Sequence, residues 1–294
     1  MEQRVFGKTG LKVSVLGFGA GRIGGDELSE KEVETLLNAA ADLGITLFDT
    51  ARSYGKSEER IGRHLRRRRK DIILSTKVGY GIAGYDDWTF DCVKAGIDQA
   101  LRLLQTDYLD IVHLHSCPRS TLEWGEPLRA LEDAVAAGKV RAAGYSGENE
   151  PLEWAVSSGR FGAVEHSVSI CDQRVIDDSL PREREKEMGV IAKRPLANVP
   201  WTFAECPVSH YAEEYWWRWR TMDVNARGID WPEISLRFAA FTPGVHSCIV
   251  GTVSAEHLKA NAKALARGPL PLDFVEEFRR AFKEHDPGWW TGQV

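Results

Sequence analysis

The sequence predicts an α/β barrel in which eight parallel strands alternate with helices. Short apolar runs, each the length of one strand, alternate with longer segments whose apolar residues recur with the period of a helix. Eight such strand-helix units occupy about 250 residues, the usual size of a TIM barrel. Hydrophobic residues make up 43% of the chain, enough for a large core. We therefore expect a single barrel domain over residues 1–294.

Each expected strand is a short run rich in apolar residues. The eight runs are residues 13–16, 45–48, 72–76, 109–114, 140–145, 163–167, 190–193 and 248–250. Such runs suit strands of a parallel sheet, which are buried on both faces.

The intervening segments carry the start and stop signals of helices. Ser29 and Glu32 form a capping-box pattern at the start of the first, and Gly44 and Gly138 follow two of them as stops. The expected helices are residues 28–43, 58–68, 91–104, 123–137, 151–158, a segment that ends near residue 188, 232–241 and 255–265.

Three segments lie outside this repeat. Residues 4–12, with GKTG at their centre, predict a short hairpin before the first barrel strand. Residues 201–225 are a long insertion with four tryptophans, and loops of that length often cover a binding site. The tail around residues 288–291 is expected at the same face of the barrel.

Charge and cysteine content exclude several classes of function. The formal net charge is −5, whereas a nucleic-acid-binding surface needs clustered lysine and arginine, so we expect no nucleic-acid partner. The five cysteines show no paired spacing, which favours a reducing compartment. No apolar run reaches the ~18 residues of a membrane helix and no signal peptide is visible. We expect a cytoplasmic protein without a membrane partner.

Polar residues stand where the second, third and fourth expected strands end. They are Asp49, Lys77 and His115, and Tyr54 follows shortly after Asp49. In a TIM barrel the strand ends and the loops after them form the active site. We therefore expect these four side chains to lie together at the barrel mouth.

The segments around these residues resemble the aldo-keto reductase family. The resemblance lies in GITLFDTARSYG at residues 44–55, STK at 75–77 and DYLDIVHLH at 107–115, and it extends through residues 138–146 and 251–261. It implies a TIM barrel that moves hydride between a nicotinamide cofactor and an aldehyde or ketone. It also implies Asp49, Tyr54, Lys77 and His115 as the catalytic residues.

The chemistry explains this set of residue types. Reduction of a carbonyl puts hydride on carbon and a proton on oxygen, and a tyrosine of pKa ~10 is a reluctant proton donor. Lys77 would stabilise the phenolate of Tyr54, and Asp49 would hold Lys77. His115 would donate a hydrogen bond that orients the carbonyl oxygen.

The resemblance also implies a cofactor site, with departures. Gly19, Ala20 and Asp49 match the loops that contact the cofactor, and Ser146 keeps a position that binds the nicotinamide carboxamide. Glu165 stands where the family has glutamine, so it accepts a hydrogen bond but cannot donate one when ionised. The remaining candidates are Lys193, where many relatives stack an aromatic ring, Arg194, Gly251, Thr252, His257 and Asn261.

The phosphate end of this site lacks the fixed cations that the resemblance leads us to expect. Gly251 and His257 occupy two such positions, and Thr252 offers a hydroxyl beside a helix N-terminus. Lys193 or Arg194 would contact the diphosphate, and Asn261 would face the adenine. We expect NADPH as the preferred cofactor, with NADH as the alternative.

Aromatic residues suggest the substrate class without naming the substrate. The expected pocket residues are Tyr80, Trp88, Ser116 and Trp201. Such walls favour a small apolar or aromatic aldehyde or ketone, or the face of a sugar ring. We expect a monomer or a weak homo-oligomer.

Three alternatives stay open from the sequence. Residues 19–24 fit G-x-G-x-x-G of a Rossmann dehydrogenase. His113 and His115 lie on one face of a strand, as in some barrel metallohydrolases, with His166 and His246 as further ligands, although we expect no metal. Some barrels of the resembled family are non-catalytic regulatory subunits.

Overall fold

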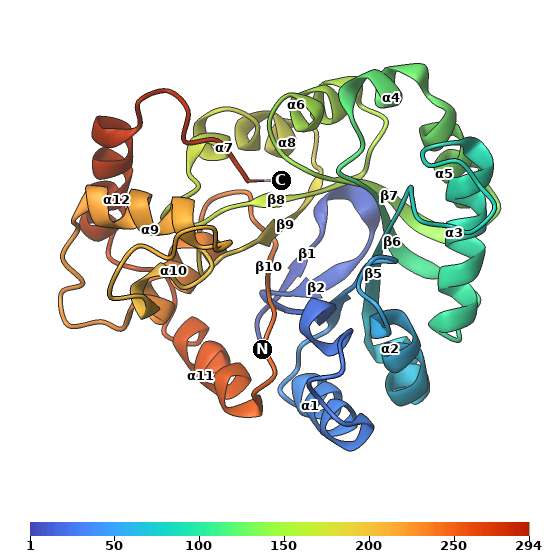
Figure 1. The fold of residues 1–294 in the computed structure, drawn as a ribbon, viewed down its shortest axis with the longest axis horizontal. Helices are drawn as coiled ribbons and strands as arrows, with labels where there is room; N and C mark the ends of the chain where they lie inside the picture. The colour runs from blue at the N-terminus through green and yellow to red at the C-terminus, as the bar shows by residue number, and fades with distance from the viewer. Residues whose placement is uncertain (294) are drawn as a thin grey trace.

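The computed structural model describes residues 1–293 and contains a closed barrel of eight parallel strands surrounded by helices (Figure 1). The ring order is β10-β3-β4-β5-β6-β7-β8-β9. The strands are β3 Leu16–Gly19, β4 Leu47–Asp49, β5 Ile73–Val78, β6 Leu109–His115, β7 Val140–Ser146, β8 Ala163–Ser167, β9 Gly189–Lys193 and β10 Ser247–Val250. The expected TIM barrel is confirmed, and a Rossmann fold, which has an open sheet, is excluded.

The first barrel strand begins three residues later than the sequence predicted. Residues 12–14 form β2 of an antiparallel hairpin with β1 (Gln3–Val5), and Val13 pairs with Arg4. β3 then pairs with β4 and β10. The apolar run at 13–16 was assigned to one strand because the sequence does not show that the chain leaves the hairpin at Val15.

The helices follow the strands in the expected order, with altered boundaries. Ser29 and Glu32 form the expected capping box on α1. The helix expected at 123–137 is two helices, because Gly125 adopts a left-handed conformation between them. The α-helices are α1 Glu30–Asp42, α2 Ser57–Leu65, α3 Phe90–Leu103, α4 Arg119–Trp124, α5 Glu126–Ala136, α6 Asn149–Ser158, α7 Arg174–Asp177, α8 Leu180–Glu185, α9 Glu213–Met222, α10 Trp231–Ala240, α11 Ala255–Leu265 and α12 Leu272–His285.

The barrel interior changes from apolar to polar along the strands. Alternate residues of a strand point to the same face, and each interior layer of a TIM barrel is built from alternate strands. The layer at the amino-terminal end is apolar and packs against Phe6 and Leu11 of the hairpin segment. The next inward residues are polar on β4, β6 and β8, namely Asp49, His113 and Glu165. The polar groups therefore lie toward the carboxyl ends of the strands.

A second apolar cluster lies beside the barrel. It joins the insertion helix α9 to α10 and to α12, a helix that the sequence did not predict, and these three helices lie together in Figure 1. The chain end returns from α12 to the barrel mouth, as expected for the tail. Arg218 of α9 helps to hold it by donating to the Thr291 carbonyl oxygen at 2.9 Å. Within residues 1–293, every helix is too short or too polar to cross a membrane.

Candidate active site

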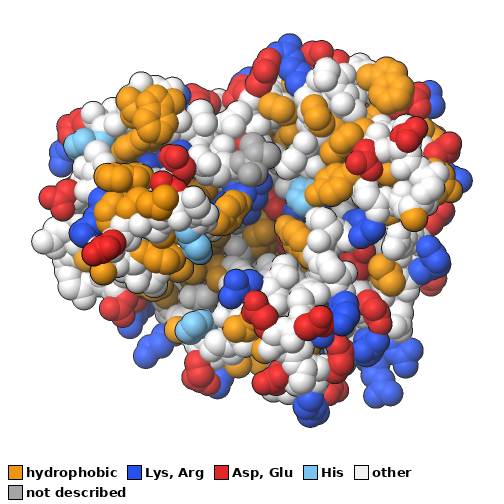
Figure 2. All heavy atoms as spheres, viewed as in Figure 1, with side chains coloured by type: hydrophobic (Ala, Val, Ile, Leu, Met, Phe, Trp, Pro, Cys, Tyr) orange, Lys and Arg blue, Asp and Glu red, His pale blue; other side chains and the backbone are white. Residues whose placement is uncertain are grey.

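The four expected catalytic residues meet at the carboxyl end of the barrel. Asp49 ends β4, Lys77 lies near the end of β5, His115 ends β6, and Tyr54 lies in the loop after β4. Asp49 and Lys77 are buried, whereas Tyr54 and His115 are partly exposed. Figure 2 shows a hollow near the centre of the viewed face, with hydrophobic, cationic and histidine side chains around it.

Lys77 is held inside the barrel by an ion pair with Asp49. The Lys77 ammonium donates to the Asp49 carboxylate and to the Thr50 carbonyl oxygen, the latter at 3.0 Å. Ser75, two residues earlier on the same face of β5, donates to the other Asp49 oxygen at 2.8 Å. Burial opposes the charge on Lys77, but Asp49 and then Glu165 raise its pKa above the ordinary lysine value. Lys77 is therefore a fixed cation.

Tyr54 lies beside this cation. The Lys77 nitrogen is 5.3 Å from the centroid of the Tyr54 ring, and the ring meets the His115 ring edge to face. Lys77 lowers the pKa of the phenol, but burial and the charges of Asp49 and Glu165 outweigh it, so that the pKa is raised. The phenol is therefore protonated at neutral pH.

His115 is fixed by Tyr80 from the loop after β5. The Tyr80 hydroxyl and Nδ1 of His115 are 2.9 Å apart, and the two rings stack at an interplanar angle of 26°. Burial and the charge of Lys77 lower the pKa of His115 to about 3, so the imidazole is neutral. When Tyr80 donates to Nδ1, the ring proton sits on Nε2, which then acts as a donor. The sequence assigned Tyr80 only to the pocket wall, and this contact with His115 was missed.

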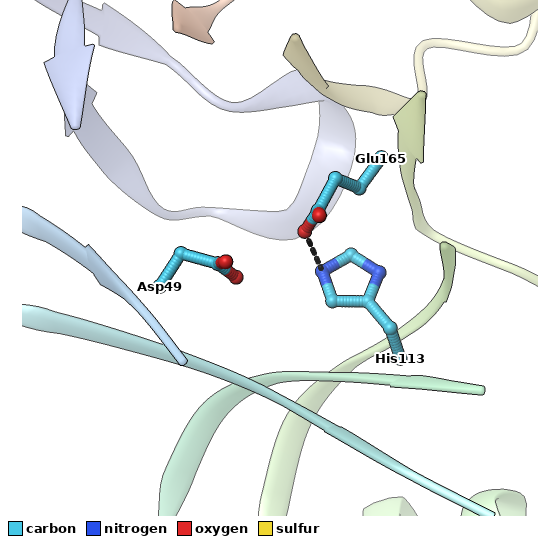
Figure 3. A group of neighbouring side chains, drawn as sticks. All are labelled: Asp49, His113 and Glu165. Carbon is cyan, nitrogen blue, oxygen red and sulfur yellow. Dashed lines mark ion pairs between the residues drawn. The ribbon is translucent and has the colours of Figure 1, made fainter. Parts of the chain in front are cut away.

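His113, Asp49 and Glu165 form a buried group below the mouth (Figure 3). One ligand-type atom from each lies within 4.8 Å of the others, and Nε2 of His113 is 3.8 Å from Oε2 of Glu165. Gly144 of β7 makes room for the imidazole, since a Cβ there would come within 2.3 Å of Nδ1 of His113. Neither ring nitrogen has a hydrogen-bond partner among residues 1–293.

The cation in this group is an ammonium. Lys77 bonds to Asp49 and lies 3.3 Å from Oε1 of Glu165, so it already bridges the two carboxylates. The other histidines considered as metal ligands lie elsewhere. His166 points away from the barrel interior to Glu183 of α8, at 3.0 Å. His246 precedes β10 and lies 3.1 Å from the Val190 amide, at the opposite end of the barrel.

The residues expected at the nicotinamide lie around the mouth, at the carboxyl ends of strands on opposite sides of the ring. Gly19 ends β3 and packs against Gly251 after β10, where a Cβ on Gly19 would lie 3.2 Å from the Gly251 nitrogen. Ala20 follows Gly19 and is buried. Ser146 ends β7 and donates to Oε1 of Glu165 at 3.3 Å.

The residues expected at the adenosine phosphate gather where β10 leads into α11. Ser254 caps α11, and Thr252 Oγ1 lies 3.3 Å from Nδ1 of His257. His257 is exposed, and Asn261 lies one turn further along the helix. Bare glycine backbone at 19 and 251, hydroxyls and a helix N-terminus suit a dinucleotide phosphate. This end of the barrel fits such a cofactor.

Lys193 and Arg194 are already bonded within the protein. Glu148, a buried residue of the β7–α6 loop, lies 3.2 Å from the Lys193 nitrogen and 3.7 Å from Arg194. Glu148 also accepts from the Ser167 amide at 2.9 Å. Arg194 in addition donates to the Gln293 carbonyl oxygen of the tail. The sequence gave no signal for Glu148, because its partners lie at the ends of β8 and β9 and in the loop after β9.

The expected substrate residues fall into two groups. Tyr80, Trp88 and Ser116 lie in loops after β5 and β6, and Tyr80 packs against Trp88 with centroids 5.5 Å apart. Trp201 instead stacks on Trp231 of α10 at 6.0 Å, inside the second apolar cluster. Its role at the substrate stays a prediction, whereas its packing against Trp231 is seen in the structure.

The fold and this arrangement of charges define a barrel oxidoreductase, and the comparisons name the family. The family model described as "Aldo/keto reductase family" matches residues 15–283 of this chain. The chain is similar to the holo form of an aldo-keto reductase from Bacillus halodurans, with a TM-score of 0.82, 26% identity and 96% of both chains covered. This chain belongs to the aldo/keto reductase family.

Two curated relatives from Arabidopsis thaliana differ in what their names describe. L-galactose dehydrogenase is 31% identical over 284 residues, which cover 90% of this chain and 88% of the relative. A protein named as a probable voltage-gated potassium channel subunit beta is 34% identical over 94% of this chain and 96% of its own length. The similarity spans both a named enzyme and a named channel subunit.

Proposed function

We propose that this protein is an NAD(P)H-dependent carbonyl reductase that transfers hydride between a nicotinamide cofactor and a small aldehyde or ketone. The observation that carries this proposal is the position of Lys77, buried in contact with Asp49 and 5.3 Å from the centroid of the Tyr54 ring. A buried cation this close to a phenol favours its phenolate form, which is the form that Tyr54 takes after it gives up its proton.

In this proposal Tyr54 donates the proton to the carbonyl oxygen and Lys77 stabilises the phenolate that remains. Neutral His115 orients the oxygen by donating from Nε2, with Tyr80 holding its other nitrogen. The cofactor supplies the hydride. Gly19, Ala20, Ser146 and Glu165 would hold its nicotinamide end.

The remaining contacts follow from the same loops. Thr252, His257 and Asn261 would bind the adenosine end, with NADPH preferred over NADH. Tyr80, Trp88 and Ser116 would contact an apolar or aromatic carbonyl compound, with Trp201 behind them. We further propose that the protein acts in the cytoplasm as a monomer or weak homo-oligomer.

The test is turnover of NADPH with a reactive aromatic aldehyde such as a nitrobenzaldehyde. Tyr54→Phe keeps the ring and removes the proton donor, so the rate should fall by ~10² to 10⁴ while cofactor affinity is kept. Tyr108→Phe is the matched control, because Tyr108 packs on Arg69 away from the mouth. If Tyr54→Phe retains most of its activity, Tyr54 is not the proton donor.

Two further outcomes separate the alternatives. Activity should survive dialysis against a strong chelator, and loss of one bound zinc together with activity would favour the metallohydrolase. Cofactor binding without turnover of any of several aldehydes and ketones would favour a regulatory subunit.

A further inference from the structure

Glu165 reaches Lys77 from the far side of the barrel. β8, which carries Glu165, stands four strands from β4 in the ring, which carries Asp49. The side chain crosses the interior, and Oε1 comes within 3.3 Å of the Lys77 nitrogen. Ser146 donates a hydrogen bond to this carboxylate, whereas Oε2 has no hydrogen-bond partner within residues 1–293 and lies 3.8 Å from Nε2 of His113.

The charged and titratable groups that face Glu165 come from four other strands. They are Lys77 on β5, Asp49 on β4, His113 and His115 on β6, and Lys193 on β9, which pairs with Glu148. Burial lowers the pKa of His113 to about 4 and that of His115 to about 3, so both imidazoles are neutral. Lys77 is therefore the one cation inside the barrel that both carboxylates contact.

The two carboxylates compete for that cation. Burial, and then the charge of Glu165, raise the pKa of Asp49, with Lys77 opposing them. Burial also opposes ionisation of Glu165, but the charge of Lys77 lowers the pKa of this carboxyl. Two acids and one ammonium leave an excess of negative charge beneath Tyr54 when all three are ionised.

We propose that Glu165 is a positioning residue that shares Lys77 with Asp49 and so raises the proton affinity of Tyr54. The proposal rests on the proposed role of Tyr54 as proton donor. Without Glu165 the full field of Lys77 would stabilise the phenolate. With it, the phenol keeps its proton, which suits proton donation to a carbonyl and confines alcohol oxidation, which needs the phenolate, to alkaline pH.

The direct test is an absorbance titration of tyrosine in the free protein. The chain has seven tyrosines, so the titration of each variant is subtracted from that of the same variant carrying Tyr54→Phe, which isolates Tyr54. In the wild type this residue should titrate at or above the ordinary value of about 10. In Glu165→Gln the transition should move down by about one to two pH units, because one nearby negative charge is lost.

Two variants control this result. Glu183→Gln removes an equally buried carboxylate that also bonds a histidine, His166, but on the outer side of β8, and it should leave the Tyr54 transition unchanged. Glu165→Asp keeps the charge and should restore most of the wild-type value. The pH profile of alcohol oxidation should shift downward in Glu165→Gln by the same amount.

Each outcome decides the proposal. A folded Glu165→Gln protein with an unchanged Tyr54 transition overturns it. If Glu165→Gln does not fold, the wild type alone decides, because a Tyr54 transition well below pH 10 shows that Lys77 is not shared. If the transition moves as expected in a protein that reduces no carbonyl, the proposed function fails while the proton-affinity effect stands.

Discussion

The two sides of the barrel mouth differ in how their charges are held. On the side of β4 and β5, Lys77 and Asp49 are buried and bonded to each other. Their bonds are made by the protein alone, and Tyr54 lies beside a cation that is already in place. This side needs no ligand to be organised.

On the side of β9 and β10, the cations are neutralised or absent. Glu148 lies between Lys193 and Arg194, while Gly251 and His257 stand where the family resemblance leads us to expect fixed charges. A phosphate that used Lys193 or Arg194 would compete with Glu148 for these cations. If the proposed function holds, the reacting groups are fixed by the fold, whereas cofactor affinity depends on groups whose charge can change.

The largest expected effect comes from removing the Lys77 cation on the side of β4 and β5. Lys77→Met should reduce carbonyl reduction by at least ~10²-fold, because it removes the cation beside Tyr54. It should also lower the free energy of unfolding by ~3 to 5 kcal/mol, because the carboxylates of Asp49 and Glu165 stay buried without their partner. Urea unfolding and steady-state kinetics measure the two effects.

The control for this change is a pair at the surface. Lys139 bonds Asp98 at 2.5 Å with both side chains about two-fifths exposed, so Lys139→Met should cost less than ~1 kcal/mol. Equal losses in the two variants would show that burial of the Lys77 ion pair is not what stabilises the site.

A second prediction concerns the loss of folding stability at low pH. Burial lowers the pKa of His113 to about 4 in the folded protein, against ~6.5 in an unfolded chain. Protons therefore bind the unfolded state more tightly, and this contribution to stability is fully present above pH ~6.5 and lost as the pH falls toward 4. The loss for His113 alone is on the order of 3 kcal/mol.

Unfolding free energies of the wild type and His113→Gln between pH 7 and pH 4 check this. The variant should lose less stability over that range, by about the amount assigned to His113. An identical slope in both proteins would mean that the imidazole takes up its proton in the folded state without penalty.

Short-range patterns in the sequence predicted much of the fold and of the site on the side of β4 and β5. The bounds of β8 and α11 agree with the sequence prediction, and Ser29 caps α1 as expected. Asp49, Lys77 and His115 were predicted to lie together because parallel strands bring their carboxyl ends to one face. These features depend on residues that are close in the sequence or on strands that are neighbours in the ring.

What the sequence did not predict depends on contacts between residues that are far apart in the sequence. Glu165 meets Lys77 only because the barrel closes, and Gly144 admits His113 only when β6 and β7 pair in the observed register. Glu148, in the loop after β7, meets Lys193 at the end of β9. No local periodicity contains such information, and for the same reason the start of β3 was misplaced beside the hairpin.

The third prediction tests the role of His257 on the side of β9 and β10. If its imidazolium contacts the 2′-phosphate of NADPH, that charged contact contributes ~1.5 to 3 kcal/mol, or about ten- to a hundredfold in affinity. Histidine side chains lose their charge between about pH 6 and pH 8, so the preference for NADPH over NADH should weaken as the pH rises. His257→Arg should keep the preference at high pH, and His257→Ala should lack it throughout. The measurement is the ratio of the two dissociation constants from pH 6 to 9, and a flat ratio in the wild type contradicts the assignment.

The smallest expected effect comes from freeing the two cations that Glu148 neutralises. Glu148→Gln keeps an oxygen to accept from Ser167 and removes the charge that faces Lys193 and Arg194. Both NADPH and NADH carry the diphosphate, so both should bind about three- to tenfold more tightly, a gain of roughly 1 kcal/mol. Their ratio should not change, which separates this effect from that of His257. Quenching of tryptophan fluorescence measures both constants, with urea unfolding as the check on folding. Weaker binding of both cofactors by a stable Glu148→Gln protein would mean that Glu148 positions the two cations for the diphosphate and does not compete with it.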